Sequence, residues 1–282
     1  MTRKKEYIHE PNKYLKLGFI SFWKMLFDDL RRSYNLGWRL FVRDFVSRYK
    51  QRVLGVLWVL IIPLVAALSF TLLANSEVLQ IQGMDVPYPI YVFVGVTFWN
   101  IIQGSIISLS NILNDARSII LQVNFPRVSL LISPFFTVIL NFFIQLLFFF
   151  FICFFFKFNF PLFNIFYILC LIPAVFIGIG IGMLLAIIGA VIKDIGNIIT
   201  YLFQFLLLVT PIVYPRPENS TIGDLASLNP LYYLVVVPRD LFLFGSSSEI
   251  LPYFYFSLLA VALFFIGWRF YTVAVVRITE KV

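Results

Sequence analysis

Residues 53–75 read VLGVLWVLIIPLVAALSFTLLAN, an apolar run without a charged side chain. About 20 apolar residues, each rising roughly 1.5 Å, cross a hydrocarbon core of about 30 Å. The run is therefore long enough to form a transmembrane helix. It is too long for the apolar part of a signal peptide, so we expect it to insert as a membrane anchor.

Five further apolar runs follow along the chain. They lie at approximately 88–110, 129–156, 161–192, 197–215 and 251–273. The sequence thus predicts an all-α integral membrane protein with six transmembrane helices, divided into an N-terminal segment (1–52) and a transmembrane domain (53–282). The run 161–192 exceeds a straight crossing and contains Pro173, which predicts a tilt, a kink or an extension beyond the bilayer.

The composition of the whole chain agrees with lipid as the solvent. Of 282 residues, 61% are hydrophobic and 13% are charged, whereas soluble domains carry about 25% charged residues. These values exclude a water-soluble globular domain and a disordered chain. Cys153 and Cys170 lie within apolar runs, and His9 is the single histidine, so we expect neither a redox pair nor a bound metal.

The cations are concentrated at the N-terminus. Residues 1–52 hold 13 Lys and Arg against 5 acidic residues, which accounts for the whole net charge of +8. If the N-terminus is inside, 19 Lys and Arg fall on the cytoplasmic side and 3 outside. Membrane proteins place their cations in this way. We therefore expect both termini in the cytoplasm, and a basic segment that contacts membrane lipid and no nucleic acid.

Part of the basic segment predicts an amphipathic helix in the membrane interface. Its apolar face comprises aromatic residues at spacings of three and four, namely Trp38, Phe41, Phe45 and Tyr49. Arg39 and Arg43 follow on the neighbouring face. Near an anionic leaflet each Lys or Arg gains about 1 kcal/mol. The helix is either an anchor or an entry platform or contact surface for a partner.

A short apolar segment lies in the expected external region before the last span. Residues 229–238 read NPLYYLVVVP and are followed by Arg239 and Asp240. Apolar segments of about 10–14 residues are too short to span and are usually interfacial or re-entrant. The alternatives are a hairpin that dips into the membrane near an outer mouth, and a surface loop.

The predicted spans carry amides in place of charges. Asp, Glu, Lys, Arg and His are absent from the middle of all six, which disfavours a proton-driven carrier. The polar residues there include Asn100, Gln103, Asn141, Gln145 and Gln204. Amides hydrogen-bond between helices and can also contact sugar hydroxyls. Close helix packing is predicted by small residues at every fourth position, namely Gly178, Gly182, Ala186 and Ala190.

Four blocks of sequence occur in a specific order. They are 48–58 (RYKQRVLGVLW) running into Ile62-Pro63, 124–127 (NFPR), Lys193-Asp194 with 210–215 (TPIVYP), and Asn229-Pro230-Leu231. Together they resemble the membrane subunit of ABC-type exporters of O-antigen, teichoic acid and capsular polysaccharide. Lys193-Asp194 stands where many relatives have Arg-Asp. The resemblance covers roughly residues 35–275.

The resemblance implies a permease of the bacterial cytoplasmic membrane that moves a lipid-linked polysaccharide outward. It implies a homodimer with a pore at the dimer interface, formed largely by spans one and five, and two copies of a separate ATPase subunit. ATP and Mg²⁺ would be bound by that subunit, and this chain has no Walker motif and no cofactor of its own. By position, coupling to the ATPase falls on Asn111, Asn114, Asp115, Arg117, Asn124, Phe125, Pro126, Arg127, Lys193 and Asp194. The outer gate falls on Asn229, Pro230, Tyr232, Tyr233 and Pro238.

The cargo suggests further residues. A sliding polysaccharide needs aromatic faces that stack on sugar C–H surfaces without strong binding. We expect pore or entry positions at Tyr49, Trp58, Trp99, Tyr201 and Phe205. Guanidinium groups match phosphate geometry, so we expect the pyrophosphate of the lipid carrier near Arg39, Arg43, Arg48 and Arg52.

Two other classes of function stay open from the residues alone. A membrane-embedded glycosyl- or phosphotransferase would need paired acids, whereas the cytoplasmic loops offer only single ones, Asp115 and Asp194. A passive channel would have the same hydropathy but would not explain the ordered blocks.

Overall fold

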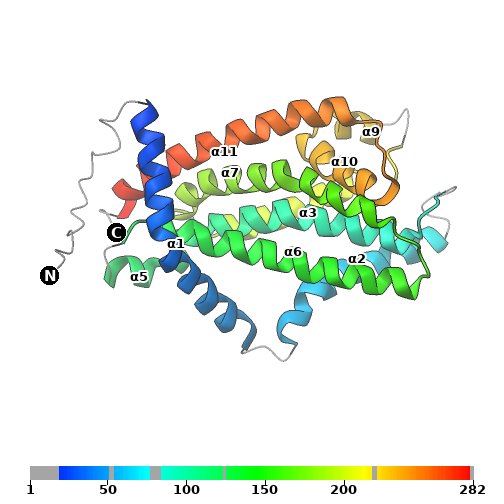
Figure 1. Ribbon diagram of the computed structural model, residues 1–282, viewed down its shortest axis with the longest axis horizontal. Coiled ribbons are helices and arrows are strands. Elements are labelled where there is room, and N and C mark those ends of the chain that lie inside the picture. Colours follow the sequence, from blue (N-terminus) through cyan, green and yellow to red (C-terminus); the bar gives the residue numbers. More distant parts are fainter. Residues whose placement is uncertain (1–18, 51–53, 77–83, 123–124, 218–220, 280–282) are drawn as a thin grey trace.

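The computed structural model describes residues 19–50, 54–76, 84–122, 125–217 and 221–279. Every regular element in this part of the chain is helical, and most of the long helices lie side by side along the long axis of the molecule (Figure 1). The elements are α1 (Phe19–Lys50), η2 (Gly55–Leu57), α2 (Trp58–Asn75), α3 (Tyr88–Ser110), α4 (Ile112–Asp115), α5 (Arg117–Gln122), α6 (Ser129–Phe155), η3 (Leu162–Leu171), α7 (Ile172–Gly189), α8 (Ile195–Val209), α9 (Thr221–Leu228), α10 (Pro230–Phe244) and α11 (Ile250–Thr279).

Five helical segments in the described residues are long and apolar enough to cross a membrane. They are Gly55–Asn75, Tyr88–Ser110, Ser129–Phe155, Leu162–Gly189 and Ile250–Val275, and they confirm five of the six predicted runs. The run predicted at 197–215 contains only the 15-residue helix α8, which extends about 22 Å. Thr210 has extended backbone angles because the following Pro211 disfavours the helical conformation. The described residues thus contain five helices of full spanning length, and not the predicted six.

Pro173 marks a change of helix type within the longest predicted run. Residues Leu162–Leu171 form a 3₁₀ helix, and α7 then begins with Pro173 in its first turn. A proline is tolerated there because the backbone N–H that it lacks has no helical partner at that position. The helix type therefore changes next to this proline.

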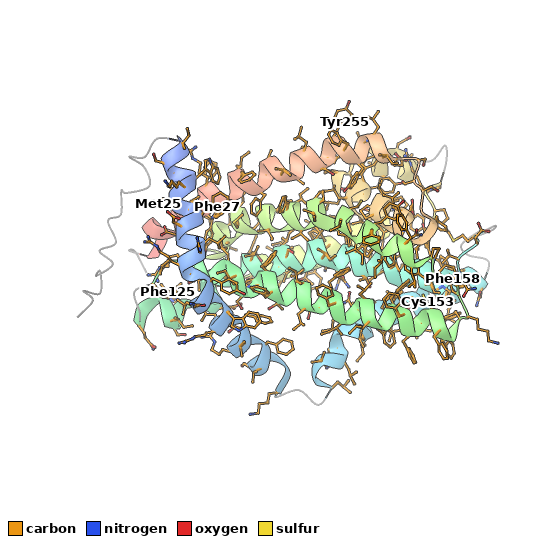
Figure 2. All side chains as sticks on the ribbon, in the orientation of Figure 1. Met25, Phe27, Phe125, Cys153, Phe158 and Tyr255 are labelled. Atoms are coloured by element: carbon orange, nitrogen blue, oxygen red, sulfur yellow. The ribbon has the colours of Figure 1, made fainter. Side chains whose placement is uncertain are left out.

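The central helix of the bundle is α3. In its most apolar 18-residue stretch 78% of the residues are buried, whereas the share is 11% for each of the segments Gly55–Asn75 and Ile250–Val275. It packs against α2, α6, α7 and α8, and on the outside Tyr255 of α11 points away from the bundle (Figure 2). The predicted close packing of small residues is confirmed, because a Cβ added at Gly182 would lie 2.8 Å from Leu109 Cβ of α3.

The amphipathic helix α1 crosses one end of the bundle, and α9 and α10 lie at the opposite end (Figure 1). The buried residues of α1 recur at spacings of three and four and form one face of the helix. They include Phe22, Leu26, Asp29, Ser33, Gly37 and Leu40. The helix begins at Phe19, well before Trp38, the first residue of the predicted apolar face. The Trp38 ring lies 5.2 Å from that of Phe136 in α6, and Trp23 lies 5.1 Å from Phe265 in α11. The helix α1 therefore contacts two different spans.

Candidate functional site

A cavity of about 550 Å³ lies among α2, α3, α6 and α8. Its volume falls within the range of ligand sites, about 300–1,000 Å³. None of the described residues that line it carries a charge. They are Trp58, Val59, Ile62, Ala66, Val96, Thr97, Asn100, Ile101, Gln103, Gly104, Ile107, Ser108, Val138, Asn141, Phe142, Gln145, Thr200, Phe203, Gln204 and Leu207. We call this space the amide cavity.

The amide cavity brings together all five amides that the sequence places within spans. Asn100 and Gln103 come from α3, Asn141 and Gln145 from α6, and Gln204 from α8. Gln145 Nε2 donates to the carbonyl oxygen of Val59 at 2.9 Å, so this amide bridges two helices. The others converge because α3 packs against both α6 and α8.

Much of the hydrogen-bonding capacity of the cavity is unused. The side chains of Asn100, Gln103 and Gln204 make no hydrogen bond to another residue that the structure describes. The Thr97 hydroxyl is buried and also has no partner among these residues. Buried polar groups normally have partners, so the cavity has groups available for a polar ligand or water.

The aromatic residues predicted for a pore or an entry have different positions. Trp58 lines the amide cavity. Tyr201 and Phe205 lie on the outward face of α8 and are 70% and 62% exposed. Trp99 requires a correction: its side chain is fully buried, and its ring lies 5.2 Å from that of Phe203. It is therefore a core residue of the chain. The side chain of Tyr49 lies outside the described residues.

A second cavity of about 390 Å³ lies beneath α1, bounded also by α3, α4 and α6. It shares Ile107 and Ser108 with the amide cavity, so the two spaces adjoin. Its polar lining includes Asp44, whose Oδ2 accepts from the Ser133 hydroxyl at 2.8 Å and whose Oδ1 accepts from Arg43 Nε at 2.9 Å. The charge of Arg43 is thus balanced by its neighbour.

The four arginines predicted to bind pyrophosphate are not equivalent. Arg39 is exposed on α1 and, among the described residues, has no ion pair. Arg43 is paired with Asp44. The side chain of Arg48 and the whole of Arg52 lie outside the described residues.

The two segments predicted to couple to an ATPase lie side by side at the α1 end. Asn114 Nδ2 donates to the carbonyl oxygen of Gly189 at 2.7 Å. A Cβ added at Gly196 would lie 2.3 Å from Asn111 Nδ2. These contacts hold α4 against the turn between α7 and α8. Lys193 and Asp194 are exposed on that turn, and Asp115 and Arg117 are exposed on α4 and α5.

Arg127 follows this segment and has an unusual environment. Its guanidinium lies 4.8 Å from the centre of the Phe125 ring, and Phe125 lies at the α1 end of the molecule (Figure 2). Its Nε and Nη1 are buried without a partner among the described residues, and this burial lowers the pKa of Arg127. The carbonyl of Pro126 accepts from the Ser129 hydroxyl at 2.7 Å at the start of α6. Asn124 lies outside the described residues.

At the opposite end, three side chains hold the irregular backbone that follows α8. Residues 210–213 are buried but not helical. The Tyr88 hydroxyl donates to the carbonyl oxygen of Val213 at 2.7 Å, and Asn229 Nδ2 donates to Thr210 Oγ1 at 2.9 Å. Arg239 Nη1 donates to the carbonyl oxygen of Ile212. Irregular backbone at membrane depth requires such partners. We call Tyr88, Asn229 and Arg239 the polar clamp.

Arg239 is the charged residue of the polar clamp, and only 3% of its surface is exposed. Its Nε and Nη2 donate to Asp240 Oδ1 at 2.9 and 2.7 Å, and its guanidinium lies 4.0 Å from the centre of the Tyr91 ring. Burial alone would lower the pKa of Arg239, but Tyr91 and Asp240 raise it above its ordinary value. Sequence reasoning counted this residue only as an external cation.

The segment predicted as an outer gate forms the helix α10. Asn229 caps it, because Asn229 Oδ1 accepts from the Leu231 N–H at 3.0 Å, and Pro230 occupies its first turn. Tyr232, Tyr233 and Pro238 are buried within it. The helix packs against α3, α11 and η3, so the surface-loop alternative is wrong.

Comparisons with known proteins agree with this arrangement. Residues 36–243 match the family model described as ABC-2 type transporter. The chain is also similar to the O-antigen export system permease protein RfbA of Myxococcus xanthus, with 26% identity over 209 residues that cover 71% of this chain and 77% of that protein. The matched region includes the amide cavity, the adjoining segments at the α1 end and the polar clamp.

Proposed function

Because the chain belongs to the ABC-2 type transporter family, we propose that it is the permease subunit of an ATP-driven exporter of a lipid-linked polysaccharide. Membership of this family makes the chain a multi-pass membrane protein and a transport subunit, and it implies partnership with an ABC ATPase. The cargo, its carrier lipid and the bacterial cytoplasmic membrane are part of the proposal, which the similarity to an O-antigen export permease supports.

The observation that carries the proposal is the uncharged, amide-lined cavity between helices. Proton-driven carriers place ionisable side chains within their spans, whereas this cavity offers amides and a tryptophan ring at Trp58. Amides exchange hydrogen bonds with hydroxyls, and an aromatic ring stacks on the C–H face of a sugar. A polysaccharide matches both kinds of group.

We propose that two copies of the chain form a pore between them. The outward faces of α2 and α8 present large exposed apolar side chains, including Ile62, Leu68, Tyr201 and Phe205. The helix α8 together with residues 210–213 would make the sixth crossing, and α9 with α10 would form the re-entrant pair. The α1 end, which carries the basic segment and at which α11 ends (Figure 1), would face the cytoplasm.

The proposal is tested by purifying the tagged chain in mild detergent after expression with its genomic neighbours. We expect an ATPase subunit in near-equimolar amount, ATP hydrolysis that requires Mg²⁺, and a mass that fits two copies of each chain. Recovery of the chain alone would contradict the exporter and would favour a passive channel or a membrane-embedded transferase.

If the cations of α1 guide the pyrophosphate of the carrier lipid, removal of the Arg39 charge should reduce export. The change Arg39→Gln removes an exposed, unpaired guanidinium and should lower export about fivefold, since one cation near an anionic surface contributes about 1 kcal/mol. Export is measured as glycan accumulated at the cell surface, and the melting temperature of the purified chain is measured in parallel. Lys24→Gln is the matched control, because Lys24 is also an exposed cation and lies nearer the start of α1. A fall in melting temperature with Arg39→Gln would instead make this residue a structural anchor.

A further inference from the structure

We infer that the amide cavity binds a neutral, hydroxyl-rich stretch of saccharide within each protomer and rejects stretches that carry phosphate or carboxylate groups. The inference deepens the proposed function, on which it rests, by naming the class of polymer. It follows from three properties of the cavity: unused hydrogen-bonding groups, absence of charge among the described lining residues, and an aromatic wall.

The unused groups are of the kind that hydroxyls satisfy. Thr97 lines the cavity and is 4% exposed, and its buried hydroxyl has no partner among the described residues. Asn100 and Gln103 lie on the same helix and are likewise unpaired within the described residues. An amide both donates and accepts, and so does a sugar hydroxyl. A neutral saccharide can therefore complete every one of these bonds, whereas a purely apolar ligand such as an acyl chain leaves them unpaired.

The absence of charge sets the selectivity. A phosphate or carboxylate that enters the cavity loses its hydration, and no cation among the described lining residues compensates for that loss. The adjoining cavity adds to the barrier, because Asp44 and Asp115 line it and its one arginine, Arg43, is already paired with Asp44. Anionic polymers are thus disfavoured in both cavities, which adjoin at Ile107 and Ser108.

The aromatic wall gives the site a preferred face. Trp58 and Ile62 line the cavity and are also exposed on α2, so the cavity opens along this helix. A tryptophan at the opening can stack on the C–H face of a pyranose ring and leave its hydroxyls directed toward the amides. The cavity volume of about 550 Å³ suits a short oligosaccharide segment.

The test is protection of a cysteine placed in the cavity. In a background in which Cys153 and Cys170 are changed to alanine, Gln103→Cys is made in the full chain, which is reconstituted in lipid nanodiscs with any ATPase that co-purifies. A water-soluble maleimide then reacts in the presence of maltoheptaose or an oligogalacturonate of similar length. Both probes are α-1,4-linked hexose chains, and they differ in the carboxylate on each sugar and in the configuration at C4. Ser76→Cys, which is exposed and outside the cavity, is the matched control.

We expect about 20 mM maltoheptaose to slow labelling of Gln103→Cys about threefold, as a site with a Kd of about 10 mM would require. We expect no slowing by the oligogalacturonate, and none at Ser76→Cys by either probe. Equal protection by both probes, or none by maltoheptaose, would overturn the inference. So would failure of the maleimide to label Gln103→Cys while it labels Ser76→Cys, because the cavity would then be closed to water.

The failure of this inference can be told from failure of the proposed function. If no ATPase co-purifies but maltoheptaose still protects Gln103→Cys, the exporter is wrong and the neutral-sugar site stands. If glycan export is demonstrated but neither probe protects, the exporter stands and the site is wrong.

Discussion

The substitution Arg239→Met is expected to destabilise the folded chain by about 3–5 kcal/mol, as removal of one partner from a buried ion pair typically does. The arginine is almost completely buried, and it alone among the polar clamp carries a charge. Methionine fills a similar space, but it leaves the carbonyl of Ile212 and the carboxylate of Asp240 without their donors. The irregular backbone after α8 then loses its main support. We expect a sharp fall in melting temperature in detergent and loss of export.

The controls for this prediction lie at the same end of the molecule. Arg216 Nη1 pairs with Glu249 Oε1 at 3.1 Å, but both side chains are partly exposed. Arg216→Gln should therefore cost less than about 1 kcal/mol. Arg239→Lys keeps the charge without the two-pronged geometry and should fall between the two. If Arg239→Met melts no lower than Arg216→Gln, the polar clamp does not stabilise this end.

The substitution Gly180→Val is expected to prevent the chain from accumulating in folded form. A Cβ at Gly180 would lie 2.8 Å from backbone atoms of Leu263 and Phe264 in α11, and one at Gly267 would lie 2.4 Å from the carbonyl oxygen of Gly180. Backbone atoms cannot move aside without separating α7 from α11. Small residues permit such close contacts between membrane helices. The yield of monodisperse protein in size-exclusion chromatography measures the effect.

Gly104→Ala is the matched control for this prediction. This glycine lies in α3, and an added Cβ would meet only Val138 Cγ2, at an ordinary 3.7 Å. Alanine also favours a helix over glycine by about 1 kcal/mol. The folded yield should therefore stay the same or rise. Equal yields for Gly180→Val and Gly104→Ala would show that the α7–α11 contact tolerates separation.

Hydropathy predicts most of the fold because bilayer thickness fixes the length of a spanning helix. The predicted run 88–110 coincides with the helix Tyr88–Ser110, and the predicted run 161–192 contains the η3 and α7 helices. Hydropathy overestimates the run at 197–215, because the apolar residues after Val209 are held as irregular backbone by side chains from α3 and α10. Tyr88 and Arg239 lie far from Thr210 in the sequence, so the hydropathy pattern around Thr210 gives no indication of these hydrogen bonds.

The candidate site could be predicted by residue type but not by arrangement. The amides were visible as polar residues in apolar runs, yet only the packing of α3 on α6 and α8 shows that they share one cavity. Trp99 was misplaced because apolar residues occur on every side of α3, so no periodic pattern indicates which neighbour its ring faces. Arg239 was missed because it directly follows an apolar segment and resembles a charge at a membrane boundary.

The contacts of α1 have a consequence for biosynthesis. The ring of Phe27, which Figure 2 places where α1 meets α11, lies 5.2 Å from that of Trp268, and the guanidinium of Arg269 lies 5.3 Å from the centre of the Phe22 ring. The helix α1 (Phe19–Lys50) is synthesised more than 200 residues before these residues of α11. Until then the apolar face of α1 has to be sheltered elsewhere, and the membrane surface can hold it through its neighbouring cations. Once α11 is complete, the apolar face of α1 can leave the lipid and pack against α11.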